Sequence, residues 1–193
     1  MSDLSDIKAA ARKAAYATRK TAHAGGQRAA LTARDHFLAS RLATGAKVIA
    51  AYRPIRTELD PTPLMEALHR AGHRIVVPVI VAEARPLEFH EWWPEVAMRE
   101  GAFGAEVPVD THVLIPDLIL APLLTFDRHG FRLGYGGGFY DRTLELLRGQ
   151  RRVRAFGFAY AAQEVAEVPI EPTDQRLDGF VTERGIIPVG VAA

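Results

Sequence analysis

The sequence predicts a single α/β domain, over residues 1–193, in which helices flank a mainly parallel β-sheet. The chain has 193 residues, of which 48% are hydrophobic, and this suits one domain with a sizeable core. Short apolar runs alternate with segments of helical periodicity, and glycine or proline separates most of them. Strands that alternate with helices are typical of layered domains, because parallel strands need crossover connections.

Two helices are expected before the first strand. Leu4 to Ala22 is alanine-rich, with Ser2 or Asp3 as its cap, and a glycine pair ends it. Gln27 to Leu42 is expected to form the second helix, because apolar residues recur there at roughly helical spacing. These residues are Leu31, Phe37, Leu38 and Leu42. We expect both basic helices, residues 4–42, to pack on the α/β core.

The remaining elements are expected to alternate. Apolar runs typical of buried strands are Lys47–Tyr52, Arg74–Val79, Leu87–Trp92, Leu118–Ala121, Val153–Phe158 and Gly179–Thr182. Two further helices are expected, one opened by Asp60-Pro61 and stopped at Gly72, the other from Phe139 to Leu147. A loop rich in proline and acidic residues is expected over 163–178.

The composition excludes several classes of protein. Because the chain has no cysteine, it cannot form disulfides, thiolate-ligated metal sites or a thiol nucleophile. Its serines, at positions 2, 5 and 40, do not lie in the nucleophile motif of serine hydrolases. The longest apolar run, Val113 to Leu124, is too short to span a membrane, and the N-terminus has no apolar signal segment. We therefore expect a soluble cytoplasmic protein.

Charge is distributed unevenly along the chain. Residues 1–56 carry 11 Lys and Arg against 3 Asp and Glu, a net charge of +8, whereas residues 57–193 have a net charge of −7. The basic half is explained by an anionic partner such as nucleic acid, by acidic residues of the same chain, or by a solvated helix face. No lysine follows a glycine, which excludes the Walker A phosphate loop.

The glycine-rich segment Arg132–Arg142 carries the strongest functional signal. Four glycines lie between positions 134 and 138, after an expected strand and before an expected helix. Glycine permits positive φ and close approach of the backbone to a ligand, and a helix N-terminus attracts phosphate. Arg132 and Arg142 add cations suited to phosphate oxygens. The dinucleotide motif is excluded, because residue 139 is phenylalanine where that motif needs glycine. A simple flexible turn is the alternative.

The segment 132–141 closely resembles the nucleotide loop of the 5-formyltetrahydrofolate cyclo-ligase family. The resemblance extends over nearly the whole chain, in order and spacing. Its other parts are Lys8–Arg12, Arg53–Thr62, Leu87–Trp92, Gly101–Gly104, Thr125–Asp127 and Glu171–Asp174. The resemblance implies a fold of the NagB/RpiA/CoA-transferase type. It also implies ATP- and Mg²⁺-dependent closure of 5-formyltetrahydrofolate to 5,10-methenyltetrahydrofolate, through a phosphorylated formyl group, with release of ADP and phosphate.

The resemblance also implies the residues that bind ATP and catalyse the reaction. The nucleotide would contact the N-terminal helix and the glycine loop, with Arg132 on the transferring phosphate and Tyr140 near the formyl group. The ATP-binding residues implied are Lys8, Ala9, Ala10, Ala11, Arg12, Arg132, Leu133, Gly134, Tyr135, Gly136, Gly137, Gly138, Phe139 and Tyr140. Phe139 departs from the tyrosine common at this position, so a hydroxyl is missing there.

Metal and folate contacts follow from the same resemblance. Asp141 and Asp174 are implied as Mg²⁺ ligands; as alternatives, Asp141 is a first-turn helix acid and Asp174 a turn residue. The implied folate-binding residues are Arg12, Arg53, Glu58, Phe103 and Tyr140. Arg53 stands where the family usually has an apolar residue. As alternatives, Glu58 is solvated and Phe103 belongs to the core.

The sequence is also compatible with two other functions. One is an enzyme with the same ATP loop that acts on another N-formyl or amide substrate. The other is an RNA-binding protein that uses the basic N-terminal half, although no aromatic RNA-binding motif is present. The resemblance favours small-molecule partners, ATP and a folate that carries one or more glutamates, with neither nucleic acid nor membrane as a partner.

Overall fold

The computed structural model describes residues 3–190, and a seven-stranded sheet forms its centre. The strand order is β11-β10-β9-β6-β1-β2-β3. Five neighbouring strands, β10 to β2 in that order, run parallel, and an antiparallel strand flanks them at each edge. The bounds are β1 Val48–Ala50, β2 Arg74–Val79, β3 Glu88–Trp92, β6 Leu118–Ala121, β9 Arg154–Phe158, β10 Gly179–Thr182 and β11 Gly185–Pro188. The expected α/β class with a mainly parallel sheet is confirmed.

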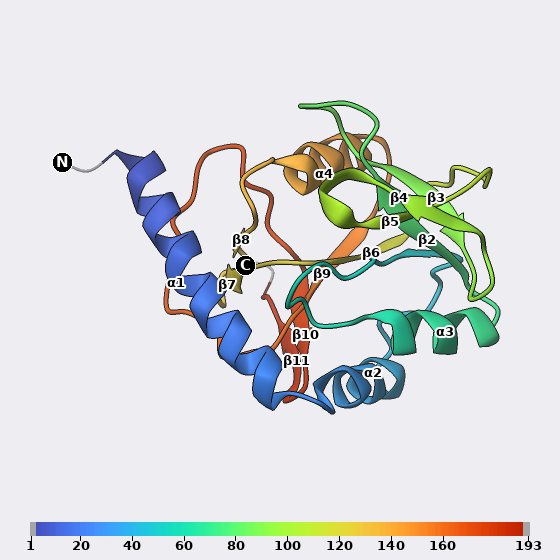
Figure 1. Cartoon of the computed structure of the whole chain (residues 1–193), viewed down its shortest axis with the longest axis horizontal. Helices are drawn as coiled ribbons and strands as arrows, with labels where there is room; N and C mark the ends of the chain where they lie inside the picture. The colour runs from blue at the N-terminus through green and yellow to red at the C-terminus, as the bar shows by residue number, and fades with distance from the viewer. Residues whose placement is uncertain (1–2, 191–193) are drawn as a thin grey trace.

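Helices cover both faces of this sheet (Figure 1). Helices α2 (Ala29–Ala39) and α3 (Thr62–Arg70) pack on one face, and α4 (Phe139–Gln150) packs on the other. Every residue of β6 and of β10 is buried. Strands buried on both faces have continuous apolar sequences, which is why these two were predicted with their correct bounds.

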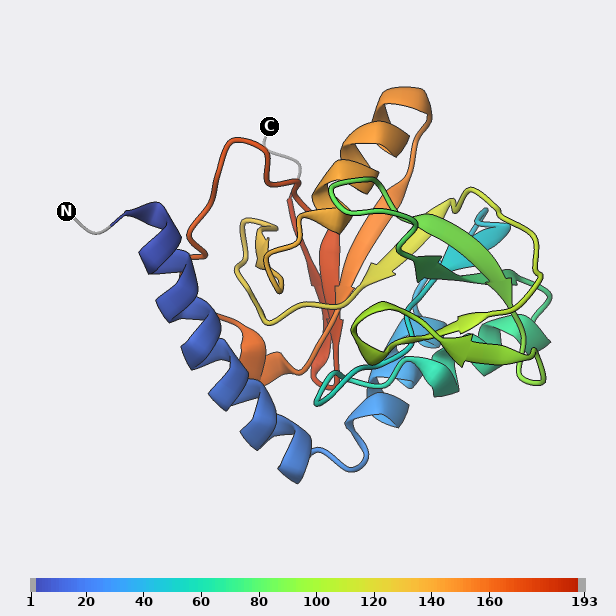
Figure 2. The same ribbon diagram turned by 45° about the horizontal axis from the view of Figure 1, so that its top comes forward.

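Helix α1 (Leu4–Gly25) lies beside the sheet rather than on one of its faces (Figures 1 and 2). It packs against the short 3-10 helix η2 (Ala161–Gln163), which follows β9. Its buried residues are Lys8, Ala15 and Arg19, so two of the three are cations. The docking of α1 therefore depends on charge as well as on apolar contact.

Two short hairpins complete the fold. Strands β4 (Met98–Glu100) and β5 (Glu106–Pro108) are joined by the 3-10 helix η1 (Ala102–Gly104). Strands β7 (Thr125–Phe126) and β8 (Arg132–Leu133) precede the glycine loop. None of these strands was predicted, and each has too few residues to show a periodic pattern.

The expected extent of the second helix is wrong. The helix spans Ala29–Ala39, and both Leu31 and Leu38 are exposed. Its buried stripe is Ala29, Ala33 and Phe37, at a spacing of four residues. This stripe faces β10 and β11. Of the apolar residues used in the prediction, Phe37 is buried and Leu42 packs partly against the core, whereas Leu31 and Leu38 were misleading.

Helix caps and the C-terminal strand differ from the sequence-based expectation in smaller ways. Asp3 occupies the N-cap position of α1 but makes no side-chain capping hydrogen bond, and Ser2 lies outside the described residues. Strand β11 was not predicted; it pairs with β10 across a tight turn at residues 183–184, and Gly185 begins it with a φ of 131°. Within residues 3–190, no helix combines the length and apolar character that a membrane span requires.

We expect Gly157→Ala to destabilise the fold. A Cβ at Gly157, in β9, would lie 2.6 Å from Leu123 Cδ2 and would overlap the Phe180 ring. Overpacking of this kind costs about 1–3 kcal/mol, which lowers the midpoint of thermal unfolding by roughly 2–10 °C. The matched control is Gly149→Ala in α4, where no atom lies within 4 Å and alanine favours the helix. Equal melting temperatures for the two variants would contradict this packing.

Candidate active site

The functional residues predicted from the sequence lie near the carboxyl ends of the parallel strands. The loop after β1 leads to Arg53 and Glu58, and the segment after β6 leads through the β7–β8 hairpin to the glycine loop. Helix α1 lies alongside, because Arg19 donates to the carbonyl of Leu123, two residues after β6. In open α/β sheets, ligands bind outside this edge.

The glycine loop contacts α1 directly. Arg12 Nε donates to the carbonyl oxygen of Gly134 at 3.1 Å. Gly136 has a φ of 103°, and a Cβ there would lie 3.3 Å from the Arg12 guanidinium carbon. Gly138 caps α4 with a φ of 64°, so the loop ends at a helix N-terminus. The predicted association of Lys8–Arg12 with the loop is present, and glycine is required where Arg12 packs.

Four charged side chains, which we call the phosphate cluster, lie together beside the loop. Lys8 Nζ lies 2.8 Å from Asp174 Oδ2, although 166 positions separate these residues in the sequence. Arg132 Nη2 lies 2.9 Å from Asp141 Oδ1. The backbone of Gln175 binds both members of this second pair, because its amide donates to Asp141 at 2.9 Å and its carbonyl accepts from Arg132 at 2.8 Å. Gln175 directly follows Asp174 in the chain, and this connects the second pair to the first. The structure thus brings Lys8, Arg132, Asp141 and Asp174 into one site.

The phosphate cluster is partly shielded from solvent. The side chains of Lys8 and Arg132 are 7% and 4% exposed, whereas those of Asp141 and Asp174 are 23% and 18% exposed. Glu171 also lies within 3.2 Å of the Lys8 ammonium. Low exposure strengthens these ion pairs, because water screens them less.

The donors present fit a magnesium ion held together with phosphate. Asp141 and Asp174 supply two carboxylates, and residues 3–190 contain no group of three or more His, Cys, Asp or Glu side chains placed to hold a metal. Mg²⁺ is usually held by one or two protein carboxylates, phosphate oxygens and water, so two carboxylates suffice. Both carboxylates now accept hydrogen bonds from cations of the cluster, which a metal ion would replace.

Glu58 is buried beneath the glycine loop. It is 5% exposed, so the alternative of a solvated glutamate is wrong. Glu58 Oε1 accepts a hydrogen bond from the Tyr135 hydroxyl at 2.7 Å, and Oε2 accepts one from the Ile55 amide at 2.9 Å. Burial raises the pKa of Glu58, while these hydrogen bonds and the charge of Arg19 oppose the rise. Glu58 therefore brings a buried carboxylate of the loop after β1 against the glycine loop.

Tyr140 follows the glycine loop in the first turn of α4. Its hydroxyl is buried and has no hydrogen-bond partner among residues 3–190. Burial raises the pKa of Tyr140, and the charge of Glu58 raises it further, so the hydroxyl stays protonated at neutral pH. A buried donor without a partner is uncommon and often marks a ligand position.

Arg53 and Phe103 lie toward the β4–β5 hairpin. Arg53 donates to Thr62 Oγ1 and to Glu106 Oε2, each at 3.2 Å, and so ties the loop after β1 to β5. Phe103 lies in η1 with a φ of 57° and is 76% exposed, so the alternative that it belongs to the core is wrong. The structure shows no contact between Phe103 and the phosphate cluster.

Two charged residues of the site were missed by the sequence analysis. Glu171 pairs with Lys8, and Arg19 donates to the Tyr135 hydroxyl at 2.8 Å. Arg19 lies on the same face of α1 as Lys8, about three turns further along. The spacing of Lys8 and Arg19 can be seen in the sequence, and it indicates that both lie on one face of the helix. It does not indicate which residues of the rest of the chain contact that face.

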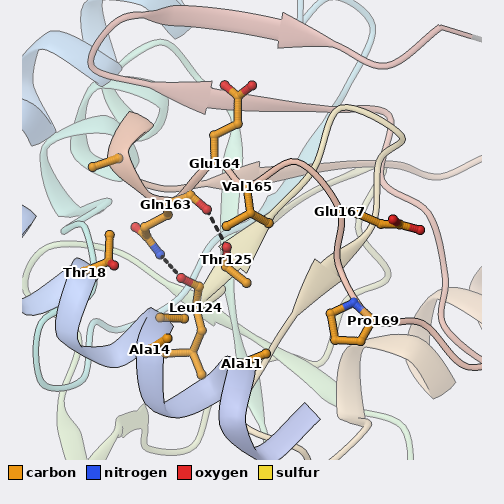
Figure 3. Close-up of a pocket in the computed structure, with 12 residues that line it drawn as sticks. Ala11, Ala14, Thr18, Leu124, Thr125, Gln163, Glu164, Val165, Glu167 and Pro169 are labelled. Atoms are coloured by element: carbon orange, nitrogen blue, oxygen red, sulfur yellow. Dashed lines mark hydrogen bonds between the residues drawn. The ribbon is translucent and has the colours of Figure 1, made fainter. Parts of the chain in front are cut away.

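A pocket of about 240 Å³ lies between α1 and the segment around Val165 (Figure 3). Ala11 and Ala14 of α1 face Thr125 and Val165, and the hydrogen bond from Thr125 to the Gln163 carbonyl forms part of its wall (Figure 3). Among the predicted site residues, only Ala11 lines this pocket. Its lining lacks the cations that phosphate binding needs, so the phosphate cluster remains the candidate site.

Comparison with known proteins gives one consistent result. A sequence model of the 5-formyltetrahydrofolate cyclo-ligase family matches residues 5–183. The 5-formyltetrahydrofolate cyclo-ligase of Escherichia coli K12 is 35% identical over 143 residues, which are 71% of this chain and 78% of the relative. That of Mycolicibacterium smegmatis is 31% identical over 159 residues, 77% of this chain and 80% of the relative.

Solved structures agree with the sequence comparisons. The 5,10-methenyltetrahydrofolate synthetase of Aquifex aeolicus superposes with a TM-score of 0.81 at 25% identity, over 97% of this chain and 95% of that one. The synthetase of Mycoplasma pneumoniae has the same fold, with a TM-score of 0.71 at 24% identity, over 91% of this chain and 98% of that one. Because the family model matches residues 5–183 and a relative is 35% identical over 71% of the chain, the chain belongs to the 5-formyltetrahydrofolate cyclo-ligase family.

Proposed function

We propose that this protein closes 5-formyltetrahydrofolate to 5,10-methenyltetrahydrofolate and consumes ATP in a Mg²⁺-dependent reaction. The observation that carries the proposal is the phosphate cluster, in which two cations and two carboxylates meet beside a glycine loop and a helix N-terminus. The printed names of the relatives supply the folate substrate and the cyclised product.

Activation of the formyl oxygen explains why the reaction needs ATP. The formyl oxygen would leave as hydroxide, which is a poor leaving group. Its attack on the γ-phosphorus of ATP releases ADP and forms a phosphorylated formyl group. N10 of the folate then attacks the formyl carbon, the carbon–oxygen bond breaks, phosphate leaves and N10 loses its proton. Phosphoryl transfer needs positioning and charge stabilisation more than a protein nucleophile, which suits a chain without cysteine.

We assign the phosphates of ATP to Arg132, Lys8 and the amides of the glycine loop. Arg132 and Lys8 are cations of low exposure, whose interactions with developing charge are strong because little water screens them. Arg12, on the loop carbonyl of Gly134, would contact the nucleotide and the substrate. On nucleotide binding, the phosphate oxygens would take over Lys8 and Arg132 from the carboxylates that now hold them.

The freed carboxylates, Asp141 and Asp174, would hold Mg²⁺ together with those phosphate oxygens. When bound, the metal supplies positive charge that stabilises the transferring phosphate. Gln175 supports this role, because its amide orients Asp141 from the residue next to Asp174.

We assign the folate to the side of the glycine loop where Tyr135 contacts Glu58, with Glu58 on the pterin and Tyr140 at the formyl group. Glu58 is a buried acceptor that suits the donor edge of a pterin, and the protonated Tyr140 hydroxyl suits the formyl oxygen. Phe103 has an exposed ring that can stack on the ligand, and Arg53 joins its hairpin to the same loop.

The structure gives less support to the RNA-binding alternative. Lys8, Arg12 and Arg19 of the basic N-terminal half contact groups of the same chain, which supports an internal role for this charge. Another N-formyl or amide substrate remains the alternative within the enzymes, and it would use the same phosphate cluster.

Product formation should require ATP and Mg²⁺ together. Incubation with 5-formyltetrahydrofolate, ATP and Mg²⁺ should produce the absorbance of the methenyl product, and omission of ATP or addition of EDTA should abolish it. Full turnover without nucleotide or with EDTA would contradict the proposal. Turnover of another N-formyl compound in preference to the folate would favour the alternative substrate.

Arg132→Ala should lower kcat by roughly 10²–10³, the range for a lost transition-state donor. The matched control is Arg152→Ala, at an exposed position, which should leave kcat unchanged. Because Arg132 also pairs with Asp141, the melting temperature of each variant is measured beside its rate. A folded Arg132→Ala variant with the parent rate would exclude the assigned role.

Asp141→Asn should raise the Mg²⁺ concentration for half-maximal rate roughly tenfold or more. Asparagine keeps the oxygen that accepts from Arg132 and Gln175 but removes the charge. Asp174→Asn should shift the Mg²⁺ curve in the same direction but less, and Glu145→Gln on the exposed side of α4 should not shift it. Unchanged curves for both aspartate variants would show that ATP alone carries the metal.

A further inference from the structure

Arg19 is among the largest fully buried side chains of the described residues, and no step of the proposed reaction uses it. It lies on α1 with a relative exposure of 0%. A lone buried guanidinium needs partners, because removal of charge from water is costly. Its contacts therefore indicate what the residue does.

Arg19 joins three segments that lie far apart in the sequence. Its Nε donates to Thr57 Oγ1 at 3.1 Å, in the loop after β1. Its Nη1 donates to the Leu123 carbonyl after β6 at 3.4 Å and to the Tyr135 hydroxyl of the glycine loop at 2.8 Å. The Arg19 side chain thus contacts both the glycine loop, to which we assign the nucleotide, and the loop after β1, to which we assign the folate.

Stability alone does not explain this residue. Its Nη2 has no hydrogen-bond partner among residues 3–190, and an unmet buried donor is destabilising. The nearest oxygen of Glu58 lies 3.8 Å from Nη1, which is an ion pair without a direct hydrogen bond. Well-packed apolar residues often replace such buried pairs without loss of stability.

The direction of the hydrogen bonds gives Arg19 a specific effect. A guanidinium only donates, so the Tyr135 oxygen accepts from Arg19 and its single proton points elsewhere. That proton is donated to Glu58 Oε1 at 2.7 Å. Arg19 therefore fixes the orientation of the Tyr135 hydroxyl, and through it the position of the Glu58 carboxylate. We call Arg19, Tyr135 and Glu58 the relay.

Aromatic contacts hold Tyr135 against α1 as well. The Arg19 guanidinium lies 5.4 Å from the centre of the Tyr135 ring and 5.6 Å from that of Tyr16. The two tyrosine rings lie 5.8 Å apart, and Arg56 also lies over both. A shift of the glycine loop would therefore move Tyr135 relative to Arg19 and alter its bond to Glu58.

We propose that Arg19 is a positioning residue that couples nucleotide binding to folate binding through Tyr135 and Glu58. The inference rests on the proposed function, which places ATP on the glycine loop and folate on Glu58. Bound phosphates fix the loop, the fixed loop holds Tyr135 between Arg19 and Glu58, and the oriented carboxylate receives the folate. Each ligand then strengthens the binding of the other by the same factor.

Calorimetric titration of the full chain tests this coupling without turnover. The dissociation constant of 5-formyltetrahydrofolate is measured with Mg²⁺ in the presence and absence of a β,γ-imido analogue of ATP. The parent should bind folate more tightly with the analogue. Arg19→Met and Tyr135→Phe should each reduce this enhancement, by about tenfold or more for a hydrogen bond to a charged group. Arg19→Lys, which keeps the charge, should restore part of it.

Two comparisons separate coupling from a structural role. The double variant Arg19→Met/Tyr135→Phe should lose no more coupling than either single variant, because both break one relay. Lys20→Met, the exposed neighbour on α1, should leave the coupling and the melting temperature unchanged. If Arg19→Met does not fold, Tyr135→Phe on the partly exposed loop carries the test.

The outcomes distinguish this inference from the proposed function. A parent that binds both ligands without mutual enhancement overturns the inference and leaves the proposed function standing. Folded variants that keep the parent enhancement, or a double variant whose losses add, also overturn it. A parent that binds neither the folate nor the ATP analogue overturns the proposed function, and the coupling with it.

Discussion

The need to pair buried cations on one face of α1 determines how the candidate site is assembled. Lys8 and Arg19 have acidic partners in segments far along the chain, Asp174 and Glu58. A buried charge without a partner is strongly destabilising, so α1 is held in the register that satisfies both. This register places Arg12 on the glycine loop and brings the N-terminal helix to the carboxyl edge of the sheet.

The same pairing would suit the highly charged ligands of the proposed reaction. Lys8 and Arg132 are already desolvated and balanced by Asp174 and Asp141. A bound phosphate would pair with the two cations, and a bound divalent cation would pair with the two carboxylates. Binding would therefore not require isolated protein charges to be removed from water. Gln175, the residue after Asp174, binds Asp141 and Arg132 through its backbone and so connects the two pairs, which suits an ion such as Mg²⁺ held by one or two carboxylates.

Much of the fold could be predicted from sequence, for identifiable physical reasons. Strands buried on both faces have the continuous apolar runs seen in β6 and β10. The glycine loop was predicted to contact Lys8–Arg12, and the structure shows Arg12 on this loop, while its binding of phosphate stays a prediction. The short strands β4 and β7 were missed, since two or three residues show no periodicity. The pairing of Lys8 with Asp174, and the role of Arg19, depend on contacts across the fold that no local pattern encodes.

The separation of Lys8 from Asp174 has a consequence for biosynthesis. Helix α1 is synthesised before Glu58, Tyr135 and Asp174, which follow in that order. Until Asp174 has been synthesised, Lys8 lacks this partner, even where Arg19 has already met its own. The ion pairs that hold α1 can therefore be completed only after the chain has been made as far as Asp174.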